Sequence, residues 1–273
     1  MSKLMVVGTP IGNLQDFSPR GIAALESCDF IAAEDTRVSL KILNRFSIKK
    51  PMISYYEHNR HERGEQIVAR ILGGETCALV TDAGMPAISD PGEDLVKLCH
   101  SHGIKVEAVP GPCAFATALA VSGMPSGRFT FEGFLSVNKS GRKEHINSLI
   151  NEQRTMIFYE APHKLLSTLK DLSDAFGDRE IAIVRELTKI HEQVVCTTLC
   201  KAVEKYSNET IKGEIVLIIR GCEKPEPIKY SIEQAVKLAR ENVNTGMSAS
   251  EASKTAAKIS GCKKGDIYKL LTE

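Results

Sequence analysis

The chain has 273 residues, of which 42% are hydrophobic and 25% are charged, and this balance is typical of folded globular proteins rather than of disordered chains. The length suits two domains of ordinary size. Because 35 basic side chains nearly balance 34 acidic ones, for a formal net charge of +1, no global field draws the protein to nucleic acid or to a membrane. Any contact with nucleic acid must therefore come from local patches of charge.

The N-terminus and the cysteines predict a soluble, cytoplasmic protein with no membrane partner. The apolar run before Gly8 is too short for a signal peptide. Glycines and prolines interrupt the uncharged stretch 108–127, whereas a membrane-spanning helix needs about 20 predominantly apolar residues. The eight cysteines are scattered without a Cys-x-x-Cys pair. We expect most of them to be buried, reduced thiols and, although Cys196 and Cys200 are close in sequence, we expect no metal site.

Residues 3–122 alternate short apolar runs with helical patterns, which predicts a first α/β domain over 1–122 built on a parallel sheet. Ser18 and Pro19 supply the N-cap and the first-turn proline of one helix, and Gly73-Gly74 closes another. The strands expected in this half are Leu4–Val7, Phe30–Ala33, Cys77–Thr81 and Val106–Val109.

Three turns rich in glycine and proline follow three of these strands: Gly8–Asn13, Asp82–Pro86 and Pro110–Cys113. In an open parallel sheet the ligand binds beyond the carboxyl ends of the strands, so the three turns predict one shared pocket. The spacing Gly8-x-x-x-Gly12 is neither the dinucleotide fingerprint nor a P-loop. This disfavours enzymes that depend on nicotinamide cofactors or on nucleoside triphosphates.

Two aspartates of the second turn have different expected roles. Asp82 directly follows a buried strand and is expected to face the crevice, where its carboxylate accepts hydrogen bonds from a ligand amine or hydroxyl. The alternative for Asp82 is an Asx-turn that shapes the loop. Asp90 precedes Pro91 and is interpreted as a helix N-cap followed by a proline at the first helical position.

The strand pattern restarts near residue 125, which predicts a second α/β domain over 123–222. Residues 162–176 are expected to form a helix with Leu165, Leu166, Leu169 and Leu172 on one face. The sequence has no full helical pattern between the last two strands, which predicts a mixed sheet. The strands expected here are Phe129–Phe134, Thr155–Tyr159, Glu180–Val184, Gln193–Leu199 and Glu214–Ile219.

A polar, proline-bearing linker over 222–227 precedes a third, helical unit predicted over 228–273. Ser231 with Gln234, and Ser248 with Glu251, have the capping-box spacing and mark two helix starts. A turn at Gly261 and a final helix make this unit resemble a helix-turn-helix. With eight basic and five acidic side chains, it is the more basic part of the chain.

Eight runs spread over the chain carry a resemblance to a known family. In the first half they are Val7–Leu14, Ile31–Arg37, Thr81–Pro86 and Val109–Pro112, and in the second half they are Gly133–Leu135, Ile157–Glu160, Arg185–Lys189 and Lys212–Glu214. These runs are similar to those of the tetrapyrrole methylase superfamily and, more narrowly, of its ribosomal RNA small-subunit methyltransferase I branch. The helical tail matches that branch's C-terminal domain, so the resemblance covers essentially the whole chain.

The resemblance implies a homodimeric methyltransferase that binds S-adenosylmethionine in a cleft between two α/β domains. The implied substrate is the ribose 2'-hydroxyl of a cytidine in the decoding region of small-subunit (16S) rRNA, either naked or in the assembled small ribosomal subunit. Met85 stands where the family often has threonine, a change that spares a backbone contact but not a hydroxyl contact. Carried over by position, the implied cofactor contacts are Pro10, Ile11, Gly12, Asp82, Gly84, Met85, Pro110, Cys113, Ala114, Phe158, Tyr159, Glu186 and Leu187.

Methyl transfer to oxygen is an in-line displacement that depends on positioning in a dry cleft. A hydroxyl is a poor nucleophile, so a base or a cationic neighbour helps. Glu160 and Arg185 are favoured as catalytic residues because they end strands that are expected to overhang the cleft. For any candidate, a salt bridge or a helix cap is the alternative. The further candidates are Asp35, Arg37, His163 and Glu186.

Clusters of cations are the candidate RNA contacts. Arg37, Lys41 and Arg45 recur every four residues and so share one helical face. The alternatives are an ordinary solvated surface and, for the tail, a packing appendage. The other candidates are Lys139, Arg142 and Lys143 in a stretch interpreted as a mobile loop, His58 and Asn59 as readers of a base edge, and the tail lysines Lys254, Lys258, Lys263 and Lys264.

Three hypotheses stay open from the sequence. The leading one is the rRNA ribose methyltransferase. A methylase of the same fold acting on a tetrapyrrole or a protein side chain would keep the cofactor loops but lack the basic stripe and the helical tail. A non-catalytic ribosome-assembly factor would bind RNA without binding S-adenosylmethionine.

Overall fold

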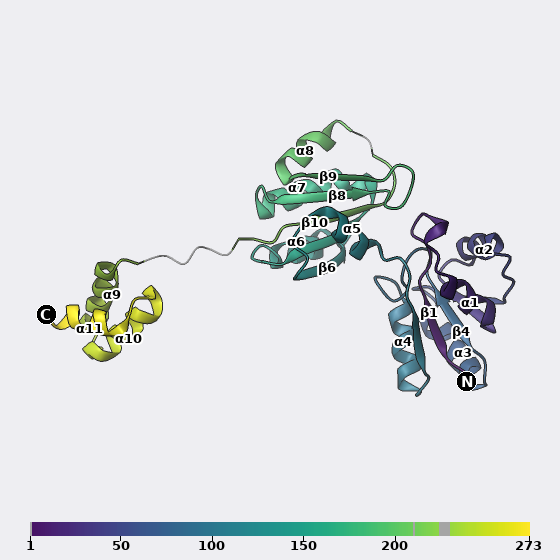
Figure 1. Ribbon diagram of the computed structural model, residues 1–273, viewed down its shortest axis with the longest axis horizontal. Coiled ribbons are helices and arrows are strands. Elements are labelled where there is room, and N and C mark those ends of the chain that lie inside the picture. Colours follow the sequence, from purple (N-terminus) through teal and green to yellow (C-terminus); the bar gives the residue numbers. More distant parts are fainter. Residues whose placement is uncertain (1, 210, 224–229) are drawn as a thin grey trace. The chain divides into compact units, whose positions relative to one another are not determined.

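The computed structural model describes residues 2–209, 211–223 and 230–273. It divides into two compact units, residues 1–222 and residues 223–273. The larger unit contains two five-stranded sheets, and the smaller one is helical (Figure 1). The finer division into domains over 1–122, 123–222 and 228–273 stays a prediction.

The first sheet is parallel throughout, as the alternating pattern predicts. Both of its faces are covered, which explains why its strands are continuous apolar runs. The pattern misses one strand, Met52–Ser54, because it is only three residues long and half-buried at the sheet edge. In spatial order the strands are β3 (Met52–Ser54), β2 (Phe30–Ala33), β4 (Cys77–Val80), β1 (Leu4–Val7) and β5 (Val106–Val109).

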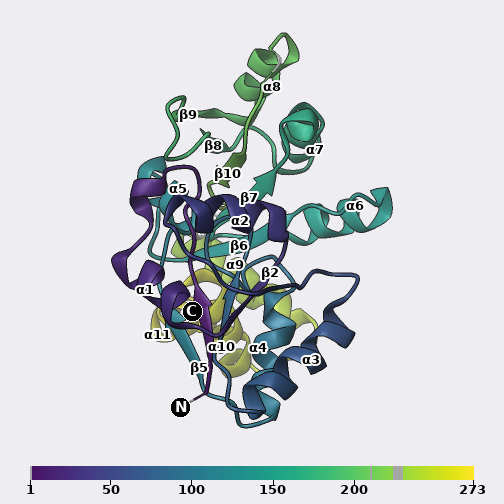
Figure 2. The same cartoon turned by 90° about the vertical axis from the view of Figure 1, so that its right-hand side faces the viewer.

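Helices pack on the two faces of this sheet because successive strand residues point to opposite sides. Leu4 and Val6 contact α3 (Arg60–Leu72) and α4 (Gly92–Ser101), which lie side by side (Figure 2). Met5 and Val7 pack with α1 (Pro19–Ser27) and α2 (Thr36–Arg45). Ser18 caps α1 through its hydroxyl, with Pro19 in the first turn, as predicted.

The second sheet is mixed, as predicted, because β10 pairs antiparallel with both β7 and β8. The predicted absence of a full helix between the last two strands is wrong: α8 (Leu199–Ser207) lies there. The helical pattern of α8 is short and directly follows β9 with no turn between them, so the sequence pattern does not separate the helix from the strand. In spatial order the strands are β6 (Phe129–Phe134), β7 (Thr155–Glu160), β10 (Ile215–Ile219), β8 (Glu180–Arg185) and β9 (Gln193–Thr198).

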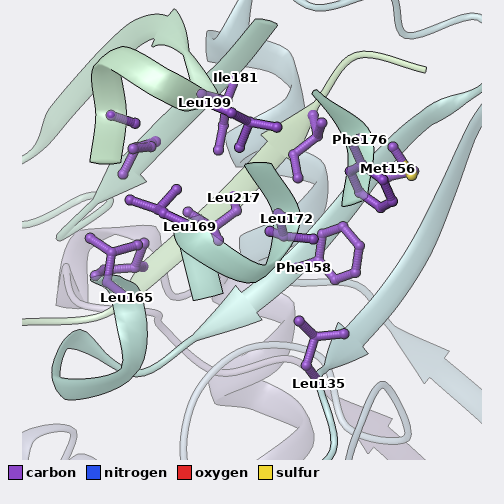
Figure 3. Close-up of a cluster of buried hydrophobic side chains, with 14 of the residues drawn as sticks. Leu135, Met156, Phe158, Leu165, Leu169, Leu172, Phe176, Ile181, Leu199 and Leu217 are labelled. Carbon is purple, nitrogen blue, oxygen red and sulfur yellow. The ribbon is translucent and has the colours of Figure 1, made fainter. Parts of the chain in front are cut away.

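One face of the second sheet carries the largest apolar core, shown in Figure 3. Leu165, Leu169 and Leu172 of α7 (Leu165–Phe176) point into it and meet Phe158 and Leu217 from the strands. Fully burying a side chain of this kind contributes about 1.5–3 kcal/mol. Helix α6 (Lys139–Ser148) adds Ile146 to the same core.

Helix α5 (Ala114–Ser122) covers the opposite face of the second sheet although it follows β5 of the first. Ala118 and Leu119 pack against Val184 and Val216, so the helix that the sequence pattern assigns to the first domain contributes to the core of the second sheet. The amide of Phe115 also donates to the hydroxyl of Tyr159 at 3.2 Å. Helix α5 therefore ties the loops of the first sheet to the second.

The smaller unit packs α9 (Ile232–Asn244), α10 (Ala249–Ser260) and α11 (Lys264–Thr272) around a core of alanines and Ile267. Ser231 and Gln234 form the predicted capping box, and Ser248 accepts from the amide of Glu251 at the start of α10. Residues 224–227 of the predicted linker lie outside the described residues. Among the described helices, none combines the length and apolarity that spanning a membrane requires.

The cysteines follow the predicted burial only in part. Cys28, Cys77 and Cys99 are buried, whereas Cys196 on the edge strand β9 and Cys200 at the start of α8 are exposed. All eight are free thiols.

Candidate cofactor site

The three loops predicted to share a pocket touch one another, because β4, β1 and β5 are neighbours in the sheet. Thr9 and Gly84 exchange backbone hydrogen bonds of 2.9 and 3.2 Å. A Cβ on Gly8 would lie 2.7 Å from Cα of Gly111, so these two loops meet through bare backbone. Gly84 has φ +89°, a conformation that favours glycine. The loop residues Ile11, Asp82 and Cys113 all border one cavity, which confirms the shared pocket.

This cavity, of about 430 Å³, lies within the size range of small-molecule sites. Its floor comes from the loops after β1, β2, β4 and β5, and its other wall comes from the second sheet. Apolar side chains such as Met85, Leu187 and Val216 supply much of the surface. The second sheet and its loops contribute Phe134, Tyr159, Glu160, Ala161, Pro162, Val184, Leu187, Gly213, Glu214, Ile215 and Val216.

The charged side chains that border the cavity are all acidic. They are Glu34, Asp82, Asp90, Glu160 and Glu214. Within the described part of the chain, no lysine or arginine borders it. A site with this charge pattern favours a ligand that carries positive charge.

Asp82 combines a structural hydrogen bond with a free oxygen. Its Oδ1 accepts from the amide of Asp35 at 3.1 Å, which joins the loops after β2 and β4. Its Oδ2 has no donor within the described part of the chain. Burial raises the pKa of Asp82 above its usual range, and the neighbouring carboxylates of Glu34 and Asp35 raise it further. The predicted orientation into the crevice is confirmed, since Asp82 borders the cavity.

Asp90 organises the second loop from inside. Its carboxylate accepts from the amides of Ala87 at 2.9 Å and Gly92 at 2.8 Å. The interpretation of Asp90 as the N-cap is wrong by one residue, because α4 begins at Gly92 and Pro91 occupies the cap position. The bond to Gly92 still satisfies an amide at the start of the helix. Ala87 and Ser89 have φ of 65° and 63°, so the carboxylate holds a tightly wound loop.

Glu34 and Thr81 join the ends of β2 and β4. The Thr81 hydroxyl donates to Oε2 of Glu34 at 2.5 Å, and both residues border the cavity. Glu34 directly follows β2, and Asp82 follows β4 after one residue, so the same positional argument could have found Glu34.

Comparison with known proteins decides the family. The model of the tetrapyrrole (corrin/porphyrin) methylases matches residues 3–203. The ribosomal RNA small subunit methyltransferase I of Synechocystis sp. is 43% identical over 274 residues, covering 100% of this chain and 98% of that protein. The protein of the same name from Thermotoga maritima is 44% identical over 223 residues, covering 82% of this chain and 100% of that protein. The chain belongs to the ribosomal RNA small subunit methyltransferase I family.

Solved structures support the fold of this family. A diphthine synthase gives a TM-score of 0.62 at 14% identity, covering 80% of this chain and 90% of that one. The uroporphyrin-III C-methyltransferase of Thermus thermophilus complexed with S-adenosyl homocysteine gives 0.56 at 18% identity, covering 80% and 97%. At such identities the likeness shows a common fold alone, and that fold is the tetrapyrrole methylase fold predicted from the sequence.

The structure brings together most of the cofactor contacts that the family resemblance implies. Phe158 does not border the cavity because β7 alternates: Tyr159 faces the cavity, whereas Phe158 is fully buried in the core of Figure 3. Pro10, Gly12 and Pro110 shape the loops but are also outside the lining. The implied contacts that do border the cavity are Ile11, Asp82, Gly84, Met85, Cys113, Ala114, Tyr159 and Leu187.

Glu186 is placed by its own loop rather than by a ligand. Its Oε1 accepts from Nζ of Lys189 at 2.8 Å and from the amide of Glu214 at 3.0 Å, and the hydrogen bond from Lys189 lowers its pKa. Glu186 has φ 52°, and the side chain of Lys189 lies against Gly12. Glu186 does not border the cavity, and a contact between Glu186 and a cofactor stays a prediction.

Of the two favoured catalytic candidates, Glu160 borders the cavity and Arg185 does not. On β8, Ile181 and Ile183 face the α7 side of the sheet while Val184 faces α5, and Arg185 continues the first set. Its Nη1 lies 3.4 Å from the carbonyl oxygen of Lys212. Arg185 is absent from the lining although Ile215, its partner on β10, faces the same side of the sheet and borders the cavity, so the expectation that Arg185 overhangs the cleft is not confirmed.

Three further catalytic candidates lie outside the lining. Asp35 caps α2 through the amide of Arg37 and pairs with the Arg37 guanidinium at 2.6 Å. Arg37 thereby lowers the pKa of Asp35 to about 2. His163 is exposed on the short 3-10 turn Pro162–Lys164. For Asp35 and Arg37 the cap and the salt bridge are the roles that the structure shows.

Glu160 is a buried carboxylate, 6% exposed, at the end of β7. Its Oε1 accepts from the amide of Ala161 at 2.8 Å, and its Oε2 accepts from the hydroxyl of Thr168 on α7. That hydroxyl in turn accepts from Nη2 of Arg142 at 2.8 Å. The chain from Arg142 through Thr168 fixes the orientation of Glu160.

The RNA candidates fall into exposed and engaged side chains. Arg37, Lys41 and Arg45 are exposed on one helix, α2, as predicted. The side-chain amide of Asn59 is already engaged, because its oxygen accepts from the backbone amide of Tyr56 and its nitrogen donates to the carbonyl of Ser54. It is therefore not free to contact a base edge. His58 is exposed beside it, and in the tail Lys263 and Lys264 are exposed at the start of α11.

The stretch that carries Lys139, Arg142 and Lys143 is the helix α6 and not a mobile loop. Asn138 caps it by accepting from the amide of Ser140. Arg142 is held by Asp171 at 2.7 Å as well as by Thr168, so it is a packing residue and not a free phosphate contact.

Proposed function

We propose that this chain transfers a methyl group from S-adenosylmethionine to the ribose 2'-hydroxyl of a cytidine in the decoding region of small-subunit rRNA. The observation that carries the proposal is the identity of 43% over the full length with a ribosomal RNA small subunit methyltransferase I. That similarity includes the basic helical tail.

The residues of the cavity fit S-adenosylmethionine. The bound cofactor supplies a methyl group on a sulfonium, and it also carries an ammonium group. The carboxylates of Asp82 and Glu34 match these positive charges, and Oδ2 of Asp82 is free to accept from an ammonium. Gly84 lets the loop backbone approach closely. The apolar walls at Ile11, Met85 and Leu187 suit an adenosine and exclude water.

Glu160 is the catalytic residue that we assign. Its carboxylate borders the cavity, and Thr168 and Ala161 fix its two oxygens. S-adenosylmethionine bound in the cavity would supply the methyl group from its sulfonium to the ribose oxygen, and the Glu160 carboxylate would accept the proton that the hydroxyl loses. The chain's further contribution is to position the two reactants in the cavity.

The partner is RNA, in the assembled small subunit or as naked rRNA. A homodimer and a cytoplasmic location belong to the same proposal: they follow from the family resemblance and from the substrate. The exposed cations of α2 and the tail are candidate phosphate contacts in both substrates.

Calorimetry and a transfer assay test this function in turn. The full chain should bind S-adenosylmethionine, and it should then pass an isotope-labelled methyl group to small ribosomal subunits or to naked small-subunit rRNA. Failure to bind the cofactor would refute an enzyme of this kind. Binding without transfer to RNA, with transfer to a tetrapyrrole or a protein, would refute the substrate.

A further inference from the structure

A second hollow, of about 700 Å³, lies between α6 and α7 on the second sheet. We call it the α6–α7 groove. Its cationic lining residues are Lys139, Arg142, Lys143 and Lys164, and its acidic ones are Asp171 and Asp174. The lining therefore has a surplus of positive charge, opposite in sign to the cofactor cavity.

Three of the four cations are free to bind an external anion. Arg142 is neutralised by Asp171 at 2.7 Å and anchored on Thr168. By contrast, the side chains of Lys139, Lys143 and Lys164 make no ion pair or hydrogen bond within the described part of the chain. Lys139 and Lys143 are exposed and Lys164 is half-buried, and lysines without partners next to a hollow are suited to bind phosphates.

The groove continues from the mouth of the cofactor cavity along two separate segments of chain. On the first, Phe134 borders the cavity while Ser136 and Val137 border the groove. On the second, Pro162 borders the cavity and Lys164 borders the groove. Two or three residues span at most about 7–11 Å, so the two hollows adjoin along both segments.

Apolar side chains stand exposed along the first segment. Phe134 is 60% exposed and Val137 is 83% exposed, so both side chains are accessible to a bound partner. Phe134 lies 5.5 Å from Tyr159, ring centre to ring centre, at the cavity. Aromatic rings in this setting stack with unpaired bases, while neighbouring cations hold the backbone.

We propose that the α6–α7 groove binds the sugar-phosphate backbone of the RNA strand next to the methylated nucleotide. Lys139, Lys143 and Lys164 contact its phosphates, and Phe134 stacks with a base at the passage to the cavity. This inference rests on the proposed function. Lys164, and not Arg142, is then the third phosphate contact beside Lys139 and Lys143. The single-stranded substrate runs from the groove into the cavity.

The test compares two triple variants of the full chain. K139Q/K143Q/K164Q removes the groove lysines, and K97Q/K170Q/K201Q removes three exposed lysines from α4, α7 and α8 that do not line it. Binding of naked small-subunit rRNA is measured by filter binding from low to high salt, with S-adenosylhomocysteine present. Calorimetry measures cofactor affinity for each protein.

For the groove variant we expect RNA affinity to fall at least about tenfold at low salt. The slope of log K against log salt should also shrink by about 2, because each single-strand phosphate contact adds about 0.7. Cofactor affinity should not change. Equal RNA losses and slopes in both variants, or none in the groove variant, would overturn the groove assignment while leaving the function intact. Absence of methyl transfer to RNA by the wild type would instead refute the function.

Discussion

Replacing Gly8 by alanine tests whether the close approach of three loops builds the cofactor site. A Cβ at position 8 would lie 2.7 Å from Cα and N of Gly111 and from Sδ of Met85, whereas carbon atoms in ordinary contact are about 3.5–4.0 Å apart. The thioether rotates away, but the two backbone atoms cannot. The loops after β1 and β5 must therefore separate by roughly 0.8 Å or more, against the bond from the Gly8 amide to the carbonyl of Val109.

Overpacking of this kind costs about 1–3 kcal/mol, and about 1 kcal/mol shifts the Tm of a unit this large by about 2–4 °C. The expected loss of Tm is therefore about 2–12 °C. Because the separated loops no longer match the ligand, the Kd for S-adenosylmethionine should also rise, and a tenfold rise would correspond to about 1.4 kcal/mol of lost binding energy.

Thermal unfolding and calorimetric titration of the full chain measure both effects. Gly127→Ala is the matched control, because a Cβ there meets no atom within 4 Å and its φ is not in the left-handed region. The control should behave as the wild type in both assays. A Gly8→Ala protein with wild-type cofactor affinity would refute the idea that the touching loops form the site.

Three further substitutions probe the walls of the cavity. Asp82→Asn keeps an acceptor for the amide of Asp35 but removes a carboxylate whose pKa burial raises. In the wild type, the carboxyl group of Asp82 binds its proton more tightly in the folded state than in the unfolded chain. Ionisation of Asp82 therefore lowers the stability of the folded state as pH rises through the raised pKa. The variant should therefore keep or gain Tm at neutral pH while calorimetry shows a weaker affinity for S-adenosylmethionine; unchanged affinity would contradict the charge argument. In the wild type, but not in this variant, affinity should decline as pH falls through the raised pKa of Asp82. Glu160→Gln should slow methyl transfer by about 10²–10⁴-fold with cofactor Kd unchanged, and normal turnover at normal affinity would remove Glu160 from the mechanism. Gly213→Ala would place a Cβ 2.2 Å from Oε1 of Glu186 at φ +95°, so its Tm should fall; a wild-type melting curve would show that the loop at Glu186 tolerates rearrangement.

The parallel sheet and its ligand edge were predictable because local signals agree with the long-range fold. Each of β1, β2 and β5 is a run that the alternation pattern delimits, and the turns at Gly8, Asp82 and Pro110 follow from the strand ends. Strand β3 was not predicted, because its three half-buried residues after Pro51 are too few to show a periodic pattern. Helix α5 lies on the second sheet because tertiary packing, not local pattern, decides which sheet an apolar helix covers.

The site was less predictable, because the side of the sheet to which a side chain points depends on strand register. A strand's period of two turns Tyr159 toward the cavity and Phe158 away from it, yet at the end of β7 Glu160, on the same side as Phe158, still borders the cavity. Chain order alone shows where a strand ends, not which residue faces which layer. The engagement of Arg142 with Asp171 likewise joins residues 29 positions apart, so a pattern of basic residues could not separate it from Lys139 and Lys143.

The acceptor atom of the proposed reaction can be identified directly on small ribosomal subunits. Small ribosomal subunits are incubated with the protein and S-adenosylmethionine carrying a labelled methyl group, and the rRNA is digested and mapped by mass spectrometry. We predict label on the ribose of one cytidine in the decoding region, on the 2'-oxygen. Label on a base, at scattered positions or only on ribosomal protein would contradict the claim.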